Sequence, residues 1–274
     1  MSKNIGLFLI FCYIFDMLSV IIPSYKDPLL IKTVDSILEN SVGEVEIIAV
    51  LDGYWPFFEL RQDPRVRYVH LGKNRGMRGA INAGVQVSRG EFIMRTDEHC
   101  SFAKGFDKAM TDVCQPNWIM TAVRYFLDPI KWEVMKEIKP FIYEKLRIRD
   151  NIKFEGQRWP SRDEERKDIM IDETMAMQGS FWIMPRKWWD DVIVELDTEH
   201  YGPMYQDSHE MIFKTWKAGG KMMLNKNTWF AHKHCTFPRT HKHGSQDQDP
   251  DIKYCLDTWG DYYKNVIAPK WFPS

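Results

Sequence analysis

Three residues of types that bind divalent cations lie in two short segments. Asp97 and His99 belong to Arg-Thr-Asp-Glu-His, and His232 belongs to Phe-Ala-His-Lys-His late in the chain. In extended backbone, residues two apart point the same way, so Asp97 and His99 can face one ion while Glu98 points elsewhere. A carboxylate with imidazoles suits a transition ion, which predicts Mn²⁺, with Mg²⁺ as the alternative.

Such an ion could bridge two phosphates of a ligand and neutralise charge when a nucleoside diphosphate leaves. Asp-x-His is a weak signal by itself, because polar loops contain it by chance. His232 is ambiguous too, since His241 and His243 follow it and a surface histidine cluster explains the same pattern.

A glycine-containing stretch runs from Asn74 to Gly84. Glycines let a loop approach a ligand closely and let a helix pack tightly. A helix that begins here offers amide donors to a phosphate, and Arg78 could add positive charge. The first glycine of the dinucleotide-binding fingerprint is missing, and an ordinary helix start fits the same residues.

Elements that can position these groups follow from the apolar pattern. Short β-branched runs predict buried strands at 18–23, 45–51, 66–71 and 91–95, and helical spacing predicts helices at 27–40 and 76–88. This order is typical of a doubly wound sheet in an α/β fold. Ligands bind beyond the carboxyl ends of such strands, where Asp52 and Asp97 lie.

The second half of the chain contains a charged segment, 128–173. We expect it to be a solvated helical insertion with a mobile loop, with an acceptor-binding lid as the functional alternative. A strand at 177–184, a helix at 209–218 and a strand at 221–231 follow. The last thirty residues cannot be placed from their pattern.

Composition narrows the class of protein. The chain has 274 residues, enough for one large domain, and a formal charge of −1, which argues against sequence-independent nucleic-acid binding. Its five cysteines are scattered and odd in number, which predicts a reducing compartment and a cytoplasmic location. The apolar run 5–15 is too short to span a bilayer comfortably, so stable membrane association is not expected; a signal peptide, a weak anchor or a true start at Met17 remain open.

In combination, these segments resemble the family 2 glycosyltransferases and the related polypeptide N-acetylgalactosaminyltransferases. The segments that carry the resemblance occur in the family's order: 20–25, 49–53, 74–84, 97–100, 178–183, 207–220 and 231–232. Two departures are Leu51, which replaces an acid, and Ile81, which stands where arginine is usual.

The resemblance implies a GT-A fold: a Rossmann-like mixed central sheet flanked by helices in a single catalytic domain. It divides the chain into an apolar extension 1–16, a nucleotide-sugar-binding half 17–115, an acceptor-binding half 116–245 that contains the insertion 128–173, and a tail 246–274. The implied activity is metal-dependent transfer of a sugar from a nucleotide diphosphate donor, a UDP-sugar, to a hydroxyl acceptor.

The resemblance also implies roles for single residues. Pro23, Tyr25 and Asp52 would hold the nucleoside, with Arg78 and Asp97 at the phosphates. Asp97, His99 and His232 would hold the metal. Asp207 and Glu210 would lie near the acceptor and the transferred sugar. For each residue the alternative is a loop or cap role, such as Asp207 as a helix N-cap.

The stereochemical course depends on one position. In inverting members the second acid of a Glu-Asp pair deprotonates the acceptor. Here Ser208 falls on that position, and serine cannot act as the base unaided, so the resemblance favours a retaining enzyme. A one-residue slip would make Asp207 the base of an inverting enzyme.

Other function classes remain as alternatives. A nucleotidyltransferase usually has a glycine-rich loop after the first strand, and 24–27 contains no glycine. A non-catalytic sugar-nucleotide binder would lack donor hydrolysis. The acceptor could be a protein, a glycan, a small molecule or a hydroxymethylated DNA base. A basic strip could meet phosphates of an anionic acceptor, or form an ordinary solvated loop: Lys233, His234, Arg239, His241, Lys242 and His243.

Overall fold

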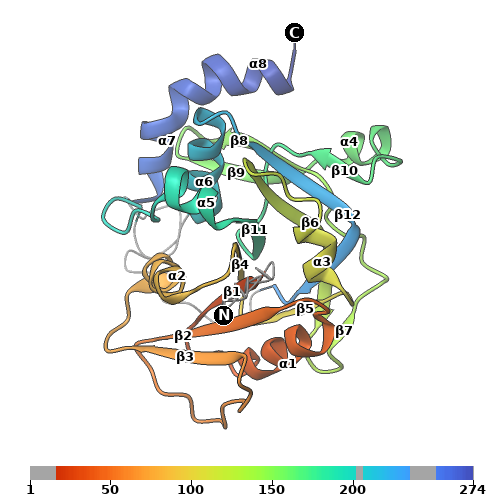
Figure 1. Cartoon of the computed structure of the whole chain (residues 1–274). Helices are drawn as coiled ribbons and strands as arrows, with labels where there is room; N and C mark the ends of the chain where they lie inside the picture. The colour runs from red at the N-terminus through yellow and green to blue at the C-terminus, as the bar shows by residue number, and fades with distance from the viewer. Residues whose placement is uncertain (1–16, 202–205, 235–250, 274) are drawn as a thin grey trace, which may run out of the picture.

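The computed structural model describes residues 17–201, 206–234 and 251–273. A ten-stranded mixed sheet forms its centre, with eight strands in the order β10-β12-β6-β11-β4-β1-β2-β3, while β5 pairs with β12 and β7 with β6 (Figure 1). A separate hairpin consists of β8 and β9. This confirms the predicted mixed α/β fold.

The first half of the sheet is parallel. Its strands are β1 (Leu18–Ser24), β2 (Val45–Asp52), β3 (Val66–Leu71) and β4 (Phe92–Thr96). Every residue of β1 and β2 is buried, because helices cover both faces of these strands. All four strands were predicted to within one or two residues.

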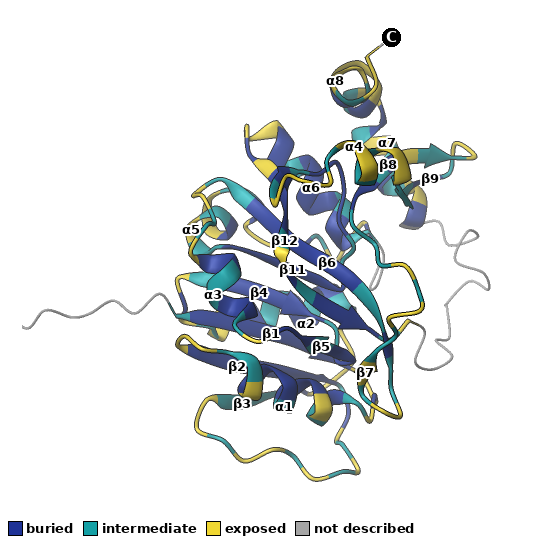
Figure 2. Ribbon diagram, turned by 90° about the vertical axis from the view of Figure 1, so that its right-hand side faces the viewer, coloured by how far each residue is buried: buried dark blue, intermediate teal, exposed yellow. Residues whose placement is uncertain are grey.

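Helices α1 (Leu30–Asn40) and α3 (Phe106–Thr111) pack in one core with β5 (Cys100–Phe102), and α2 (Gly76–Val87) packs in the other. Gly84 explains how closely α2 approaches the sheet. A Cβ there would lie 2.4 Å from Cγ2 of Ile21. The buried strands and the helices on either side of them are visible in Figure 2.

In the second half of the sheet, a strand from late in the chain pairs with a strand that directly follows the segment 97–99. This half includes β6 (Trp118–Asp128), β11 (Phe181–Pro185) and β12 (Lys221–His232). β12 runs parallel to β6 and antiparallel to β5, with His232 opposite Cys100. This register places His232 directly beside the segment 97–100.

The prediction of a helical insertion at 128–173 was wrong. The segment contains the strands β7 (Glu133–Val134), β8 (Glu144–Arg149), β9 (Lys153–Arg158) and β10 (Ile171–Glu173), with one short helix, α4 (Pro160–Glu165). Charged residues alternate with apolar ones along β8, so that Leu146 is buried between exposed or half-buried neighbours. That period of two indicates a strand; the overall charge concealed it.

The remaining elements precede and follow α6 (Asp207–Lys217) in the chain. They are α5 (Arg186–Trp188) and the π-helix η1 (Trp189–Ile193), followed after α6 and β12 by α7 (Asp251–Tyr262), η3 (Tyr263–Ile267) and α8 (Ala268–Trp271). The Trp259 ring stacks on Phe213 of α6 at 5.4 Å. The strand expected at 177–184 begins only at Phe181.

Among the described residues, no helix combines the length and apolar character needed to cross a bilayer. The apolar run 5–15 and four residues of the basic strip, 239 and 241–243, lie outside the described residues. The three described cysteines, Cys100, Cys114 and Cys255, are free thiols.

Candidate active site

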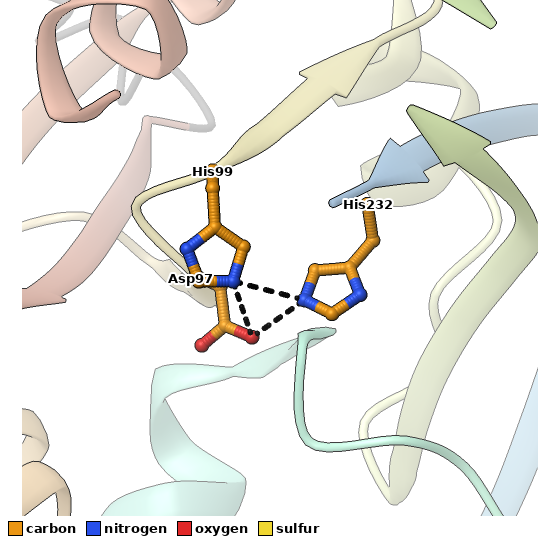
Figure 3. Close-up of side chains that lie close together, drawn as sticks. All are labelled: Asp97, His99 and His232. Atoms are coloured by element: carbon orange, nitrogen blue, oxygen red, sulfur yellow. Dashed lines mark hydrogen bonds and ion pairs between the residues drawn. The ribbon is translucent and has the colours of Figure 1, made fainter. Parts of the chain in front are cut away.

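Asp97, His99 and His232 gather at the carboxyl end of β4, with one ligand atom of each within 4.8 Å of the others (Figure 3). Nε2 of His232 lies 3.0 Å from Oδ2 of Asp97 and 3.1 Å from Nε2 of His99. Nε2 of His99 lies 3.7 Å from the same carboxylate oxygen. The sequence predicted that these side chains converge, and the structure brings them together.

These separations fit a small divalent cation. Neighbouring ligand atoms on an octahedral ion with bonds of roughly 2.1 Å are about 3 Å apart. Burial opposes ionisation of Asp97, but Arg95 and the two histidines outweigh it and hold its pKa well below the usual range. Burial lowers the pKa of His232 to about 4. At neutral pH the cluster therefore offers an ionised carboxylate and a neutral His232 imidazole, the forms that bind metals.

Asp27, which lies in the loop between β1 and α1, was not predicted from the sequence. Its Oδ2 is 2.9 Å from Nδ1 of His99, and both side chains are buried. Glu98 binds the same loop, since its two carboxylate oxygens accept the Tyr25 N–H at 3.1 Å each. Glu98 is not among the three residues whose ligand atoms cluster. The only sequence signal for Asp27 was an acid just before a helix, which is typical of a cap.

The residues predicted to hold the nucleoside lie at the carboxyl ends of β1 and β2. Pro23 pairs with Val50 in the sheet, and Asp52 ends β2. Tyr25 is 39% exposed. Asp52 is buried, and its Oδ1 accepts the N–H of Arg75 at 2.6 Å, so it caps the start of α2. Burial raises the pKa of Asp52.

Arg78 and Glu210 form a buried ion pair between α2 and α6. The Arg78 guanidinium also lies over the Tyr201 ring at 4.3 Å, and Glu210 accepts from Lys214 at 2.8 Å. The amide of Asp197 donates to both Glu210 oxygens at 3.2 and 3.3 Å. Arg78 was expected to offer its positive charge to a phosphate, but in the structure Glu210 balances that charge.

Asp207 is the first residue of α6, and its side chain is buried against the backbone of Gly179. A Cβ at Gly179 would lie 2.9 Å from either carboxylate oxygen, so glycine makes room for this carboxylate. Oδ2 of Asp207 has no hydrogen-bond partner among the described residues. Ser180, which follows Gly179, accepts the N–H of Asp97 at 3.1 Å through its backbone carbonyl.

Other buried polar atoms near the cluster also have no partner within the described part of the chain. They are Nε and Nη1 of Arg95, Oγ of Ser180 and Nδ1 of His232. Buried polar groups are nearly always hydrogen-bonded, unless a ligand or water completes them. Their concentration here indicates a site for a polar ligand. Arg95, whose Nη2 lies 2.5 Å from Oδ1 of Asp97, was not singled out from the sequence.

A groove of about 880 Å³ lies elsewhere, between α2 and η1. Residues such as Lys73, Asn82, Trp189 and Val194 line it, and none of the predicted site residues does. We place the candidate site at the cluster, because its residues are of the types that bind metal ions, whereas the groove is distinguished only by its size.

Comparisons with known proteins agree with the fold. A family model described as "Glycosyl transferase family 2" matches residues 19–193. The chain is 28% identical over 108 residues to an uncharacterized glycosyltransferase, EpsJ, of Bacillus subtilis (strain 168), which covers 37% of this chain and 31% of EpsJ. It is 33% identical over 89 residues to the glycosyltransferase GlyG of Streptococcus pneumoniae serotype 4, which covers 30% of each protein. The matched part thus spans about a third of these relatives.

Two solved structures show the same architecture. A crystal structure of GalNAc-T7 with UDP, GalNAc and Mn²⁺ matches with a TM-score of 0.68 and 16% identity, over 93% of this chain and 50% of that one. A crystal structure of Staphylococcus aureus TarS matches with a TM-score of 0.54 and 11% identity, over 80% and 37%. At these identities the likeness establishes the GT-A fold alone.

Proposed function

The chain belongs to glycosyl transferase family 2, and on that premise we propose that it transfers a sugar from a UDP-sugar to a hydroxyl acceptor in a reaction that requires a divalent cation, Mn²⁺. The observation that carries this proposal is the cluster of Asp97, His99 and His232 at the carboxyl end of β4. A bound divalent cation supplies charge neutralisation for the departing diphosphate.

The donor occupies the half formed by 17–115. Pro23, Tyr25 and Asp52 hold the nucleoside. Support for this placement comes from the position of these residues at the carboxyl edge of the parallel strands, where ligands of doubly wound sheets bind. That GalNAc-T7 was solved with UDP and Mn²⁺ agrees with the proposed donor and ion.

The acceptor meets Asp207 in the half formed by 116–245. A general base must be free to accept a proton from the acceptor hydroxyl. Asp207 has an unpartnered carboxylate oxygen, whereas Glu210 is occupied by Arg78, Lys214 and a backbone amide. Arg78 and Glu210 therefore act as a structural pair that fixes α6 against α2.

This contrast favours the inverting alternative, with Asp207 as the base, over the retaining course suggested by Ser208. An inverting enzyme gives a β-linked product from an α-linked UDP-sugar. Proton NMR of the product distinguishes the two courses, because the anomeric coupling differs. An α-linked product would refute the role of Asp207 as base.

The experiment that tests the proposed function is a screen of UDP-sugars with Mn²⁺ or with EDTA. Proteins, glycans and hydroxymethylated DNA are the acceptors, and mass spectrometry detects the product. We expect release of UDP that depends on Mn²⁺ and is lost in Asp97→Asn. Release of a sugar 1-phosphate, with the uridylyl group transferred to another molecule, would instead indicate a nucleotidyltransferase. Binding of the UDP-sugar without its hydrolysis or transfer would indicate a non-catalytic binder.

A further inference from the structure

The contact between Asp27 and His99 defines the state of the histidine ring. Oδ2 of Asp27 lies 2.9 Å from Nδ1 of His99, with 0% and 3% of the two side chains exposed. Water is therefore excluded from this contact. Oδ1 of the same carboxylate accepts the N–H of Leu29 at 2.8 Å, so both oxygens act as acceptors.

When Asp27 accepts at Nδ1, that nitrogen carries the ring hydrogen. The other nitrogen, Nε2, then presents its lone pair. It is Nε2 of His99 that lies 3.1 Å from His232 and 3.7 Å from Asp97. Histidines that bind metals almost always donate their second ring nitrogen to a carboxylate, carbonyl or water, which fixes the tautomer and the ring orientation.

Asp27 is itself held in place from two sides. The N–H of Leu30 donates to the backbone carbonyl of Asp27 at 3.4 Å at the start of α1. On the other side, Glu98 accepts the Tyr25 N–H. The loop between β1 and α1 is thus tied to the segment 97–99 by two carboxylates, one from each segment.

We propose that Asp27 is a positioning residue for the metal centre, which holds His99 as the Nδ1–H tautomer and aims Nε2 at the ion. Asp27 touches neither the ion nor the substrate and acts only through His99. This inference rests on the proposed metal-dependent function. The competing explanation is that Asp27 only caps the loop through Leu29.

Asp107 provides a matched control. It is another buried aspartate that ties a loop, since it accepts the N–H groups of Val42 and Gly43 at 2.7 to 3.1 Å, and it has no metal-ligand histidine as partner in the described structure. Asp27→Asn removes the charge but leaves an oxygen that can still accept from Leu29, so this variant should fold. Circular dichroism and thermal unfolding verify the folded state of each variant.

Mn²⁺ affinity is measured by titration of the free Mn²⁺ signal in electron paramagnetic resonance. We expect Asp27→Asn to weaken binding roughly 10- to 100-fold. Asp107→Asn should bind Mn²⁺ like the unchanged protein. If Asp27→Asn also binds equally well, or both variants weaken alike, the inference is overturned while the metal-dependent function stands.

A second readout does not need the ion. Long-range ¹H–¹⁵N NMR spectra of the metal-free protein report which nitrogen of His99 carries hydrogen. We expect the Nδ1–H form in the unchanged protein and its loss in Asp27→Asn; an Nε2–H form in the unchanged protein would overturn the inference. Failure of the unchanged protein to bind Mn²⁺, with the Nδ1–H form intact, would refute the proposed function and support the Asp27–His99 contact.

Discussion

Nε2 of His99 and Nε2 of His232 lie 3.1 Å apart, although 133 residues separate them in the chain. The antiparallel pairing of β12 with β5 produces this contact, because it sets His232 opposite Cys100. Two imidazoles and the Asp97 carboxylate thereby meet at one end of the sheet. The pairing of these strands is as necessary to the proposed metal centre as the ligands themselves.

Replacement of His232 by alanine should weaken Mn²⁺ binding by about 100-fold or more, because it removes one of three ligands, a larger change than the 10- to 100-fold loss typical of residues behind them. The matched control is His234→Ala, since His234 is exposed and its ring centre lies 6.0 Å from that of His232. Calorimetric titration with Mn²⁺ measures both variants. Equal affinities in the two variants would remove His232 from the site.

Replacement of Gly179 by alanine should lower transfer without unfolding the protein. The added methyl group would lie 2.9 Å from both Asp207 oxygens. Because these are side-chain atoms, the Asp207 carboxylate can shift to relieve the contact while the backbone stays in place. We expect transfer to fall toward that of Asp207→Asn, with donor hydrolysis less affected. Gly72→Ala is the control, because a Cβ there meets nothing within 4 Å. Unchanged transfer in Gly179→Ala would show that the position of Asp207 does not matter.

Loss of Arg78 should destabilise the fold strongly. Arg78→Met leaves the Glu210 carboxylate buried without its arginine, which typically costs about 3–5 kcal/mol. The double variant Arg78→Met with Glu210→Leu should recover part of this loss, since Lys214 alone no longer has to balance a buried carboxylate. Arg61→Met breaks an exposed pair with Asp35 and should change stability little. Urea unfolding measures all three, and an equal effect of Arg78→Met and Arg61→Met would contradict this assignment.

Glu144→Gln should stabilise the protein at pH 8 but not at pH 4. Burial raises the pKa of Glu144 from 4.5 to about 7, against the opposing charge of Arg124. A carboxyl with a raised folded-state pKa favours folding fully below pH 4.5, and this contribution is lost as the pH rises through 7. Glutamine has no such loss, so the gain at pH 8 is on the order of 3 kcal/mol. Unfolding curves at both pH values measure the change in the free energy of unfolding. A gain in stability at pH 4 but not at pH 8 would contradict the prediction.

Much of the fold follows from local pattern, and less of the site does. The runs that became β1 to β4 carry their burial in their own composition, so their positions could be predicted. The strands of 128–173 could not, because charge concealed the alternation in β8. Asp97, His99 and His232 were found through residue type and family order. Asp27 and Arg95 were missed, because their roles depend on contacts that only the folded chain creates.

The partners of Asp207 and Glu210 show the same limit. Both are acids near the start of one helix, and nothing in the sequence distinguishes their roles. In the structure Glu210 is paired with Arg78 of α2, while Asp207 lies against Gly179 with an unpartnered oxygen. Which acid is free to react is decided by segments distant in the chain.

The proposed metal centre is tested most directly by anomalous X-ray diffraction at the manganese edge, from crystals of the protein grown with Mn²⁺ and UDP. If these three residues hold the ion, one strong anomalous peak will lie within bonding distance of the Asp97 carboxylate and of Nε2 of both His99 and His232. A fully loaded crystal with no peak at these three atoms, or with the peak at other residues, would contradict the proposed metal centre.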